Sequence, residues 1–269
     1  MALGGSRLRH ALAQPADEFG GDPFRSLQWP ELRREFFGNA PLQFDARVQV
    51  RSPAFAEDAM NVPITVSTVG LADVKLITML VDRNPIRKML EYFPLGAVPS
   101  VSFRFKLEQA SPVRAAVRTR DGVWHVGGTL VDSAGGGCTV AGVTRNDGSW
   151  SRTLGTATGR LFPSSVPASF PSSVPNSAVP GRAEGSMLTR LRVRVMHPMD
   201  TGLVGGIPAF YVNRLSVRDA QGQELLRLNA FEPISENPVF SFDFTDPPPG
   251  RLRLVGSDNN GNRIDSVIE

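Results

Sequence analysis

The chain has 269 residues, of which 41% are hydrophobic and 20% are charged, and Lys and Arg exceed Asp and Glu by 29 − 26 = 3. This composition is typical of globular proteins, and the length allows two ordinary domains or one large one. No apolar run approaches the roughly 18 residues of a membrane span, so we expect no membrane partner. Arginines alternate with apolar residues, which favours solvated strand faces over a nucleic-acid surface, and we expect no nucleic acid as a partner.

The N-terminal tail, residues 1–23, leaves two interpretations open. Ala11, Leu12 and Ala13 before Gln14 form the A-x-A pattern of a signal-peptidase site, but residues 1–10 lack the apolar segment of a signal peptide. The tail is therefore either the remnant of an export signal or an ordinary polar terminus.

The helical signal lies in residues 29–38, WPELRREFFG. Pro30 suits the first helical turn, Glu31 suits the positive helix N-terminus, and Gly38 is a suitable stop. The sequence predicts one short helix. Its apolar face would consist of Leu32, Phe36 and Phe37.

From residue 42 the pattern changes to period two, which is typical of strands. Residues 101–107, VSFRFKL, alternate apolar and polar residues, which predicts a strand with one buried face and one exposed face that carries Lys106. Residues 76–81 are apolar on both faces and predict a central strand. Residues 113–126 predict a hairpin that turns at Asp121-Gly122.

Residues 151–187 have the composition of a linker. An octapeptide rich in Pro and Ser is repeated there, as FPSSVPAS at 162–169 and FPSSVPNS at 170–177. Proline removes ladder donors and favours extended polyproline II, so the sequence predicts a semi-rigid linker rather than a strand.

Alternation resumes beyond the linker. Residues 191–195 predict a strand, residues 213–228 predict a hairpin, and Phe240, Phe242 and Phe244 alternate with polar residues in a further strand. Residues 251–255 predict another strand. Short strands with regularly spaced turns indicate a sandwich. The predicted fold class is all-β, with two β-sandwich domains at residues 24–150 and 188–269.

Cys138 is the only cysteine of the chain and follows Gly135, Gly136 and Gly137. Glycine lacks a Cβ and resists regular structure, so the residues predict a thiol on a flexible, uncrowded arm. Such an arm is expected to tolerate valine at Gly136 or Gly137 without loss of folding. An exposed thiol would also form disulfide-linked dimers under air. The alternative is a small buried hydrophobe beside an ordinary turn.

The sequence around Cys138 contains no activating group. No Lys, Arg or His lies within six residues of it, and Asp132 would oppose ionisation of the thiol. This suits a passive carrier that is not an enzyme. A cysteine-dependent enzyme would need a base, for which His125 on the preceding strand is the candidate. That alternative stays open, as does a non-catalytic binding module with an inert thiol.

We expect no metal and no cofactor. The three histidines lie at positions 10, 125 and 197, without metal-ligand spacing. His197 and Met199 could hold copper, but a structural turn at a strand end explains them better. Residues 258–263, DNNGNR, mimic the start of a calcium loop, but Arg263 stands at the position where such a loop needs glycine. A hairpin turn explains these residues better.

Several short motifs point to a family. The first half contains AED at 56–58, VPITV at 62–66, VDRNP at 81–85 and GGC at 136–138. The second half contains MHPMDTG at 196–202, IPAFY at 207–211, SENP at 235–238 and DNNG at 258–261. With these motifs the first half resembles the SoxY subunit, and the second half the SoxZ subunit, of the bacterial sulfur-oxidation carrier.

The resemblance to fused SoxYZ-like carriers, some of them associated with quinoprotein dehydrogenases, implies two paired immunoglobulin-like sandwiches. It implies that Cys138 covalently holds inorganic sulfur species on an arm of Gly135, Gly136 and Gly137. It implies a thiol-loading cytochrome, a sulfate-releasing hydrolase and a sulfur dehydrogenase as partners, a periplasmic location, and docking of the sandwiches within one chain or by linker exchange in a dimer. Classical SoxY ends in its cysteine motif, whereas here Thr139 and the whole second half follow Cys138.

Overall fold

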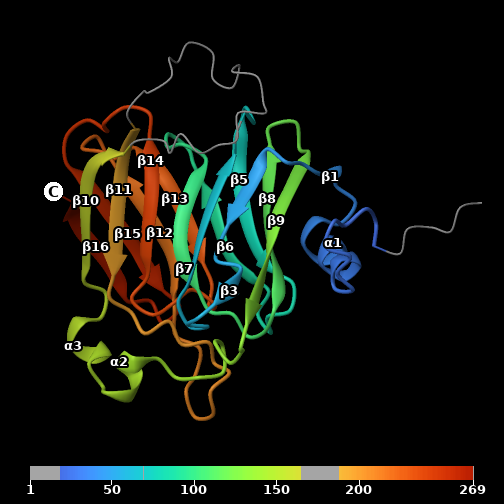
Figure 1. The fold of residues 1–269 in the computed structure, drawn as a ribbon. Coiled ribbons are helices and arrows are strands. Elements are labelled where there is room, and N and C mark those ends of the chain that lie inside the picture. Colours follow the sequence, from blue (N-terminus) through green and yellow to red (C-terminus); the bar gives the residue numbers. More distant parts are fainter. Residues whose placement is uncertain (1–18, 69, 165–187, 269) are drawn as a thin grey trace, which may run out of the picture.

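The computed structural model describes residues 19–68, 70–164 and 188–268. These residues form two β-sheets that face each other (Figure 1). Helix α1 (Trp29–Phe37) packs on the outer face of one sheet, and the short helices α2 (Val143–Asn146) and α3 (Trp150–Thr153) lie at one end of the molecule. No helix in the described ranges is long and apolar enough to cross a membrane.

The larger sheet has ten strands in the described part of the chain. Nine of them follow the order β1-β9-β8-β5-β6-β13-β12-β15-β16, and β3 pairs with β9. Their bounds are β1 Leu42–Phe44, β3 Phe55–Ala56, β5 Val74–Val81, β6 Lys88–Phe93, β8 Ser111–Thr119, β9 Trp124–Ser133, β12 Val212–Arg218, β13 Glu224–Ala230, β15 Leu252–Asp258 and β16 Arg263–Ile268.

The smaller sheet has six described strands in the order β10-β11-β14-β7-β4-β2. Their bounds are β2 Val48–Arg51, β4 Val62–Thr68, β7 Ser100–Phe105, β10 Ala157–Ser164, β11 Leu188–Val195 and β14 Val239–Phe244.

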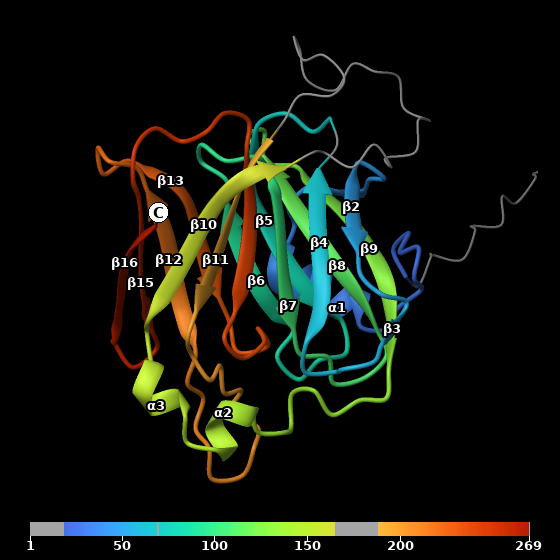
Figure 2. The same ribbon diagram turned by 60° about the vertical axis from the view of Figure 1, so that its left-hand side comes forward.

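Each half of the chain forms a sandwich, and the two sandwiches are joined edge to edge (Figure 2). In the larger sheet β6 pairs antiparallel with β13, with Leu90 opposite Ala230. In the smaller sheet β7 pairs antiparallel with β14, with Ser102 opposite Ser241. The predicted all-β fold of two sandwiches is confirmed, and both sheets run without a break from one half into the other.

A single hydrophobic core continues between the sheets through both halves. The rings of Tyr92 and Phe242 lie 5.6 Å apart, and those of Phe103 and Phe240 lie 6.4 Å apart. Because each aromatic side chain buries roughly 150–250 Å² of surface, these contacts between the halves contribute strongly to their association. The predicted alternation of Phe240, Phe242 and Phe244 is confirmed by the burial of all three rings.

The predicted helix is α1. Leu32 and Phe37 are buried as expected, and Trp29 is buried with them against the larger sheet, whereas Phe36 is only partly buried. The central strand predicted at residues 76–81 is β5, which lies between β8 and β6. The hairpins predicted at Asp121-Gly122 and at residues 220–223 join β8 to β9 and β12 to β13.

The turn between β15 and β16 contains the calcium-loop mimic of the sequence. One carboxylate oxygen of Asp258 accepts the backbone N–H groups of Asn260 and Asn262, at 3.0 and 2.9 Å. The other carboxylate oxygen accepts the amide group of the Asn262 side chain at 2.8 Å. The hairpin interpretation is therefore confirmed.

The expected linker begins later than predicted. Residues from Ala157 to Ser164 form β10, which pairs antiparallel with β11 from Ala157 opposite Val195 to Ser164 opposite Leu188. Pro163 is compatible with this strand because β10 is an edge strand, and edge strands are where sheets tolerate proline. Residues 165–187, with the remainder of the repeated octapeptide, lie outside the described residues, and the semi-rigid linker stays a prediction there.

Candidate functional site around Cys138

Cys138 lies in the loop that follows β9, which we call the cysteine loop (residues 134–142). Its side chain is only 1% exposed, and Sγ lies 3.6 Å from the carbonyl oxygen of Lys106. The sequence predicted a thiol that reaches out of the fold on uncrowded backbone. That prediction is wrong for the conformation seen here, in which the thiol is enclosed.

Backbone hydrogen bonds hold the cysteine loop against the segment that follows β7. The N–H of Gly136 donates to the carbonyl oxygen of Glu108 at 3.0 Å, and the N–H of Gly137 donates to that of Leu107 at 3.1 Å. The N–H of Cys138 donates to the side-chain carboxylate of Glu108 at 2.9 Å. The loop is therefore attached through consecutive residues on the N-terminal side of the thiol.

The glycines before Cys138 serve two different needs. Gly135 and Gly136 have positive φ angles of 95° and 83°, which side chains rarely adopt. Gly137 is required for space, because a Cβ there would lie 2.1 Å from the carbonyl oxygen of Ala59 and 2.7 Å from that of Leu107. Valine at Gly137 therefore does not fit the cysteine loop as seen here, whereas its effect on folding stays a prediction.

Lys106 is a second unexpected buried group. The alternation of residues 101–107 predicted it on an exposed face, but β7 ends at Phe105, and Lys106 is 2% exposed. Its Nζ donates to the carbonyl oxygen of Met199 at 2.5 Å. Burial lowers the pKa of Lys106, while the charges of Asp200, Cys138 and Glu236 act in the opposite direction.

The surroundings keep the thiol protonated. Burial, together with the negative charge of the Glu108 carboxylate, raises the pKa of Cys138 to about 12, although Lys106 acts to lower it. Because the thiolate is the nucleophilic form, Cys138 is unreactive at neutral pH while it is enclosed in this way.

The second half of the chain closes over the cysteine. The hydroxyl of Thr201 donates to the carbonyl oxygen of Cys138 at 2.6 Å. The neighbouring Asp200 accepts a hydrogen bond from Nε of Arg145 at 2.9 Å, and a further bond joins its carboxylate to the same guanidinium. The motif MHPMDTG at 196–202 thus supplies the contacts to Lys106, to Arg145 and to the cysteine backbone.

His197 makes contacts within and beside that motif. Its Nδ1 accepts the N–H of Met199 at 3.1 Å, and its Nε2 lies 3.4 Å from the Asp258 carboxylate. Burial lowers the pKa of His197 to about 4, so the ring is neutral at neutral pH. Within the described residues no group of three or more His, Cys, Asp or Glu side chains could hold a metal ion. The interpretation of His197 as part of a structural turn agrees with these contacts.

His125 does not lie near the Cys138 thiol. Its Nδ1 lies 2.8 Å from the Asp45 carboxylate and 3.1 Å from the Gln43 amide, near the start of β9. At roughly 3.3 Å of rise per residue, the eight residues from His125 to the end of β9 alone span about 26 Å. The alternative of a cysteine enzyme with His125 as its base therefore lacks the required geometry.

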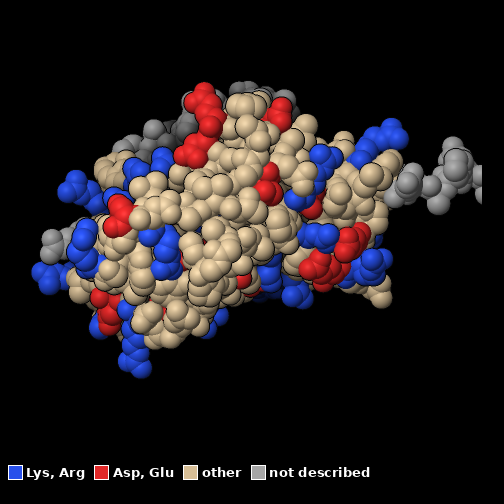
Figure 3. All heavy atoms as spheres, turned by 90° about the horizontal axis from the view of Figure 1, so that it is seen from below, with Lys and Arg blue, Asp and Glu red and all other residues tan. Residues whose placement is uncertain are grey.

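Exposed apolar side chains lie close to the enclosed thiol. Val140 and Val143 follow it in the chain, and Leu203 follows Thr201, and all three are exposed. Figure 3 shows the end of the molecule that carries α2 and α3, where much of the central surface has no charged side chain.

Sequence reasoning found Cys138 but missed Lys106, Glu108, Asp200 and Thr201 as its surroundings. Thr201 and Asp200 belong to the motif MHPMDTG at 196–202, which is the sequence signal that could have indicated them. Lys106 and Glu108 carried no signal, because their role depends on contacts between distant segments.

Comparisons with known proteins match each half of the chain to a protein family. The family described as "Sulfur oxidation protein SoxY" matches residues 33–138, so its match ends at Cys138, and "Sulphur oxidation protein SoxZ" matches residues 179–268. One similar solved structure is the sulfur carrier protein SoxY from Chlorobium limicola f thiosulfatophilum, with 20% identity, a TM-score of 0.35, and coverage of 40% of this chain and 96% of that chain. No match was found among curated proteins. The chain therefore belongs to the SoxY and SoxZ sulfur-oxidation proteins, which are carriers rather than enzymes, with a SoxY domain at its N-terminal side and a SoxZ domain at its C-terminal side.

Proposed function

We propose that this chain carries sulfur-oxidation intermediates covalently on Cys138, and that the enclosed cysteine loop is the closed state of the carrier. The observation that supports this most directly is that the only thiol of the chain lies under contacts made by the SoxZ motif, at the residue where the SoxY match ends. A carrier of reactive sulfur needs a thiol that is protected between encounters, and burial with a raised pKa gives that protection.

Loading then requires the cysteine loop to open. Opening breaks the bonds from Thr201 to the Cys138 carbonyl and from the Cys138 N–H to Glu108, and it brings Sγ into water. The pKa of the thiol then returns toward the ordinary value of about 8.5, and the thiolate can attack. The exposed Val140, Val143 and Leu203 give a partner enzyme apolar surface beside this loop, through which binding can favour the open state.

The partners implied by the family are a thiol-loading cytochrome, a sulfate-releasing hydrolase and a sulfur dehydrogenase, and their expected location is the periplasm. With thiosulfate as cargo, the Cys138 thiol and the sulfane sulfur form an S–S bond, one proton is released, and two electrons pass to the cytochrome. The product is a cysteine S-thiosulfonate. A disulfide-linked dimer would need the same opening, since an enclosed thiol cannot reach a second copy.

Intact mass spectrometry of the protein purified from its native host tests the proposal. We expect a mass increase that corresponds to an inorganic sulfur species, that is removed by a reducing agent, and that maps to the peptide containing Cys138. The Cys138→Ser protein, expressed in the same host, is the control. Unmodified Cys138 in cells that actively oxidise sulfur compounds would contradict the proposal and favour the inert binding module.

A further inference from the structure

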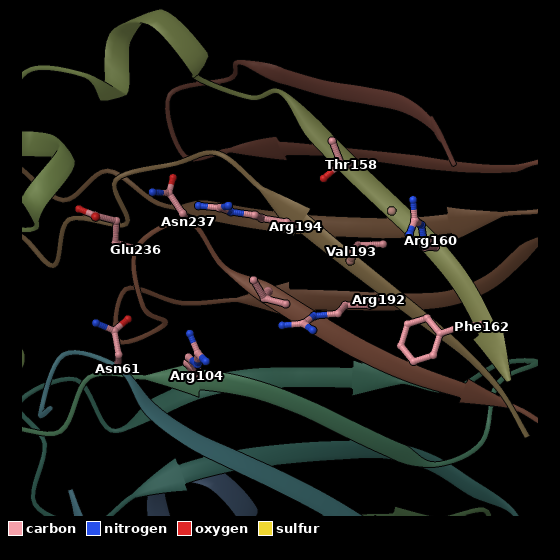
Figure 4. Close-up of a pocket in the computed structure, with 12 residues that line it drawn as sticks. Asn61, Arg104, Thr158, Arg160, Phe162, Arg192, Val193, Arg194, Glu236 and Asn237 are labelled. Atoms are coloured by element: carbon pink, nitrogen blue, oxygen red, sulfur yellow. The ribbon is translucent and has the colours of Figure 1, made fainter. Parts of the chain in front are cut away.

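The exposed face of the smaller sheet carries an open groove of about 970 Å³. Four arginines line it: Arg104 on β7, Arg160 on β10, and Arg192 and Arg194 on β11. In Figure 4 these side chains stand over neighbouring strands of one sheet, with Asn61, Glu236 and Asn237 at one end of the groove and Phe162 at the other. We call this feature the arginine groove.

The strand register concentrates the positive charge. Arg160 lies directly opposite Arg192 on the paired strands β10 and β11, and Arg194 lies opposite Thr158. Like charges directly opposite each other are destabilising in a sheet. This arrangement therefore has an energetic cost in the free protein that a bound anion would reduce.

The guanidinium groups of the arginine groove have no ion-pair or hydrogen-bond partner within the part of the chain that the structure describes. Arg190, on the same strand as Arg192 and Arg194, shows the contrast, since it forms a two-point ion pair with Asp243 at 2.8 and 3.0 Å. The carboxylate at the end of the groove is already engaged, because one oxygen of Glu236 accepts the backbone N–H and the hydroxyl of Thr144 at 3.0 and 2.9 Å.

The groove also reaches the cysteine loop. Glu236 lines the groove, and its bonded partner Thr144 follows that loop by two residues. Asn61 lines the groove from the other side, two residues after Ala59, whose carbonyl oxygen closes the space beside Gly137. A molecule bound in the groove would therefore be positioned next to the segment that must open.

We propose that the arginine groove is the docking site for a carboxylate-rich segment of a partner protein that exchanges cargo with Cys138. Guanidinium groups pair with carboxylates through two parallel hydrogen bonds, and four such groups spread along a groove match a chain of acidic side chains. The groove is much larger than a single inorganic oxyanion. The Pro- and Ser-rich segment between Leu161 and Gly181 is not a suitable occupant, because it contains no acidic residue.

The cargo exchange in this inference rests on the proposed function. Binding of an acidic peptide to the arginine groove does not depend on it and can be measured separately. The probe is a short fluorescein-labelled polyglutamate peptide, and its binding to the full chain is followed by fluorescence anisotropy at low and at physiological salt. We expect saturable binding that weakens with salt, since the Debye length falls to about 8 Å at physiological ionic strength. Arg160→Gln with Arg192→Gln should weaken it about tenfold or more, as expected when two charge-assisted contacts are lost.

The matched control is Arg118→Gln with Arg218→Gln, which removes the same charge from exposed strand positions on the larger sheet. Equal weakening by both pairs would show a non-specific charge effect and overturn the proposal. Complete displacement of the peptide by equimolar thiosulfate would also overturn the proposal and would assign the groove to an inorganic oxyanion. Tighter binding of single-stranded DNA than of the peptide would overturn the proposal as well and would assign the groove to nucleic acid. Formation of an adduct on Cys138 with tetrathionate, measured in the same variants, should not change, so a failure of the groove and a failure of the carrier function are told apart.

Discussion

The hydroxyl of Thr201 donates a hydrogen bond to the carbonyl oxygen of Cys138 at 2.6 Å, across 63 residues of sequence. Both groups are buried, and the bond joins the SoxY domain to the SoxZ domain at the residue that we propose to carry the cargo. The cysteine loop is thus closed by the other half of the molecule, so the state of the thiol depends on contacts between the two domains.

Thr201→Val should speed up modification of Cys138. The substitution keeps the side-chain volume but removes the hydrogen bond to the cysteine loop, which is worth about 1 kcal/mol and favours the closed state by about fivefold. The rate of alkylation by iodoacetamide under native conditions measures this. Thr156→Val is the matched control, because its hydroxyl bonds to the Thr153 carbonyl and does not contact the cysteine. Unchanged alkylation of the Thr201 variant would show that this bond does not restrain the loop.

Glu108→Gln should lower the pKa of the Cys138 thiol. The amide oxygen can still accept the N–H of Cys138, but the negative charge that raises the thiol pKa is gone. A titration that follows thiolate absorbance in the ultraviolet should therefore place the Cys138 transition at lower pH in this variant than in the wild type, where the pKa is about 12. Cys138→Ser gives the tyrosine background. A transition at the same or a higher pH would contradict the assigned role of the carboxylate.

Alanine at Gly137 and at Gly136 should have unequal effects. At Gly137 the new Cβ would lie 2.1 Å from the Ala59 carbonyl oxygen, so the closed loop cannot form as seen, and the thiol should react rapidly. At Gly136 the Cβ would meet no atom within 4 Å, and only the positive φ of 83° is unfavourable, at a cost of roughly 1–2 kcal/mol. Alkylation rates and thermal unfolding of both variants check this. Faster alkylation of the Gly136 variant than of the Gly137 variant would be inconsistent with the packing described here.

Cleavage of the chain within residues 165–187 should leave the two fragments associated. Strands β6 and β13, and β7 and β14, pair across the halves, and β10 of the first fragment pairs with β11 of the second along eight residues. A protease site engineered near Val174 and size-exclusion chromatography after cleavage test this, with denaturant as the control that separates the fragments. Elution of two separate fragments under native conditions would contradict the continuous sheets.

The fold was largely predictable from sequence because it depends on local alternation. The period-two patterns of residues 101–107 and 191–195, the hairpin turns at Asp121-Gly122 and Asn260-Gly261, and the helix at residues 29–38 all appear close to their expected places. Residues from Ala157 to Ser164 were predicted as linker because proline disfavours strands. They form a strand because they lie at the edge of the sheet, where proline is tolerated.

The environment of Cys138 was not predictable in the same way. The glycines gave its position in a loop, but whether a loop is open or covered depends on segments far away in sequence. Here Thr201 and Met199 belong to the second half, and they determine the burial of Cys138 and Lys106. The alternating pattern also predicted Lys106 on an exposed strand face, whereas Lys106 is buried because the strand ends one residue before it.

The measurement that tests the carrier account most directly is intact mass spectrometry of the native protein during incubation with tetrathionate. The Cys138 thiolate attacks a central sulfur, thiosulfate leaves, and a proton is released, so a cysteine S-thiosulfonate forms without an added oxidant. We predict one adduct per chain that forms slowly in the wild type, faster in Thr201→Val, and not at all in Cys138→Ser. A native wild-type protein that remains unmodified while its denatured form is fully modified, with no acceleration in Thr201→Val, would contradict a cysteine loop that opens for cargo.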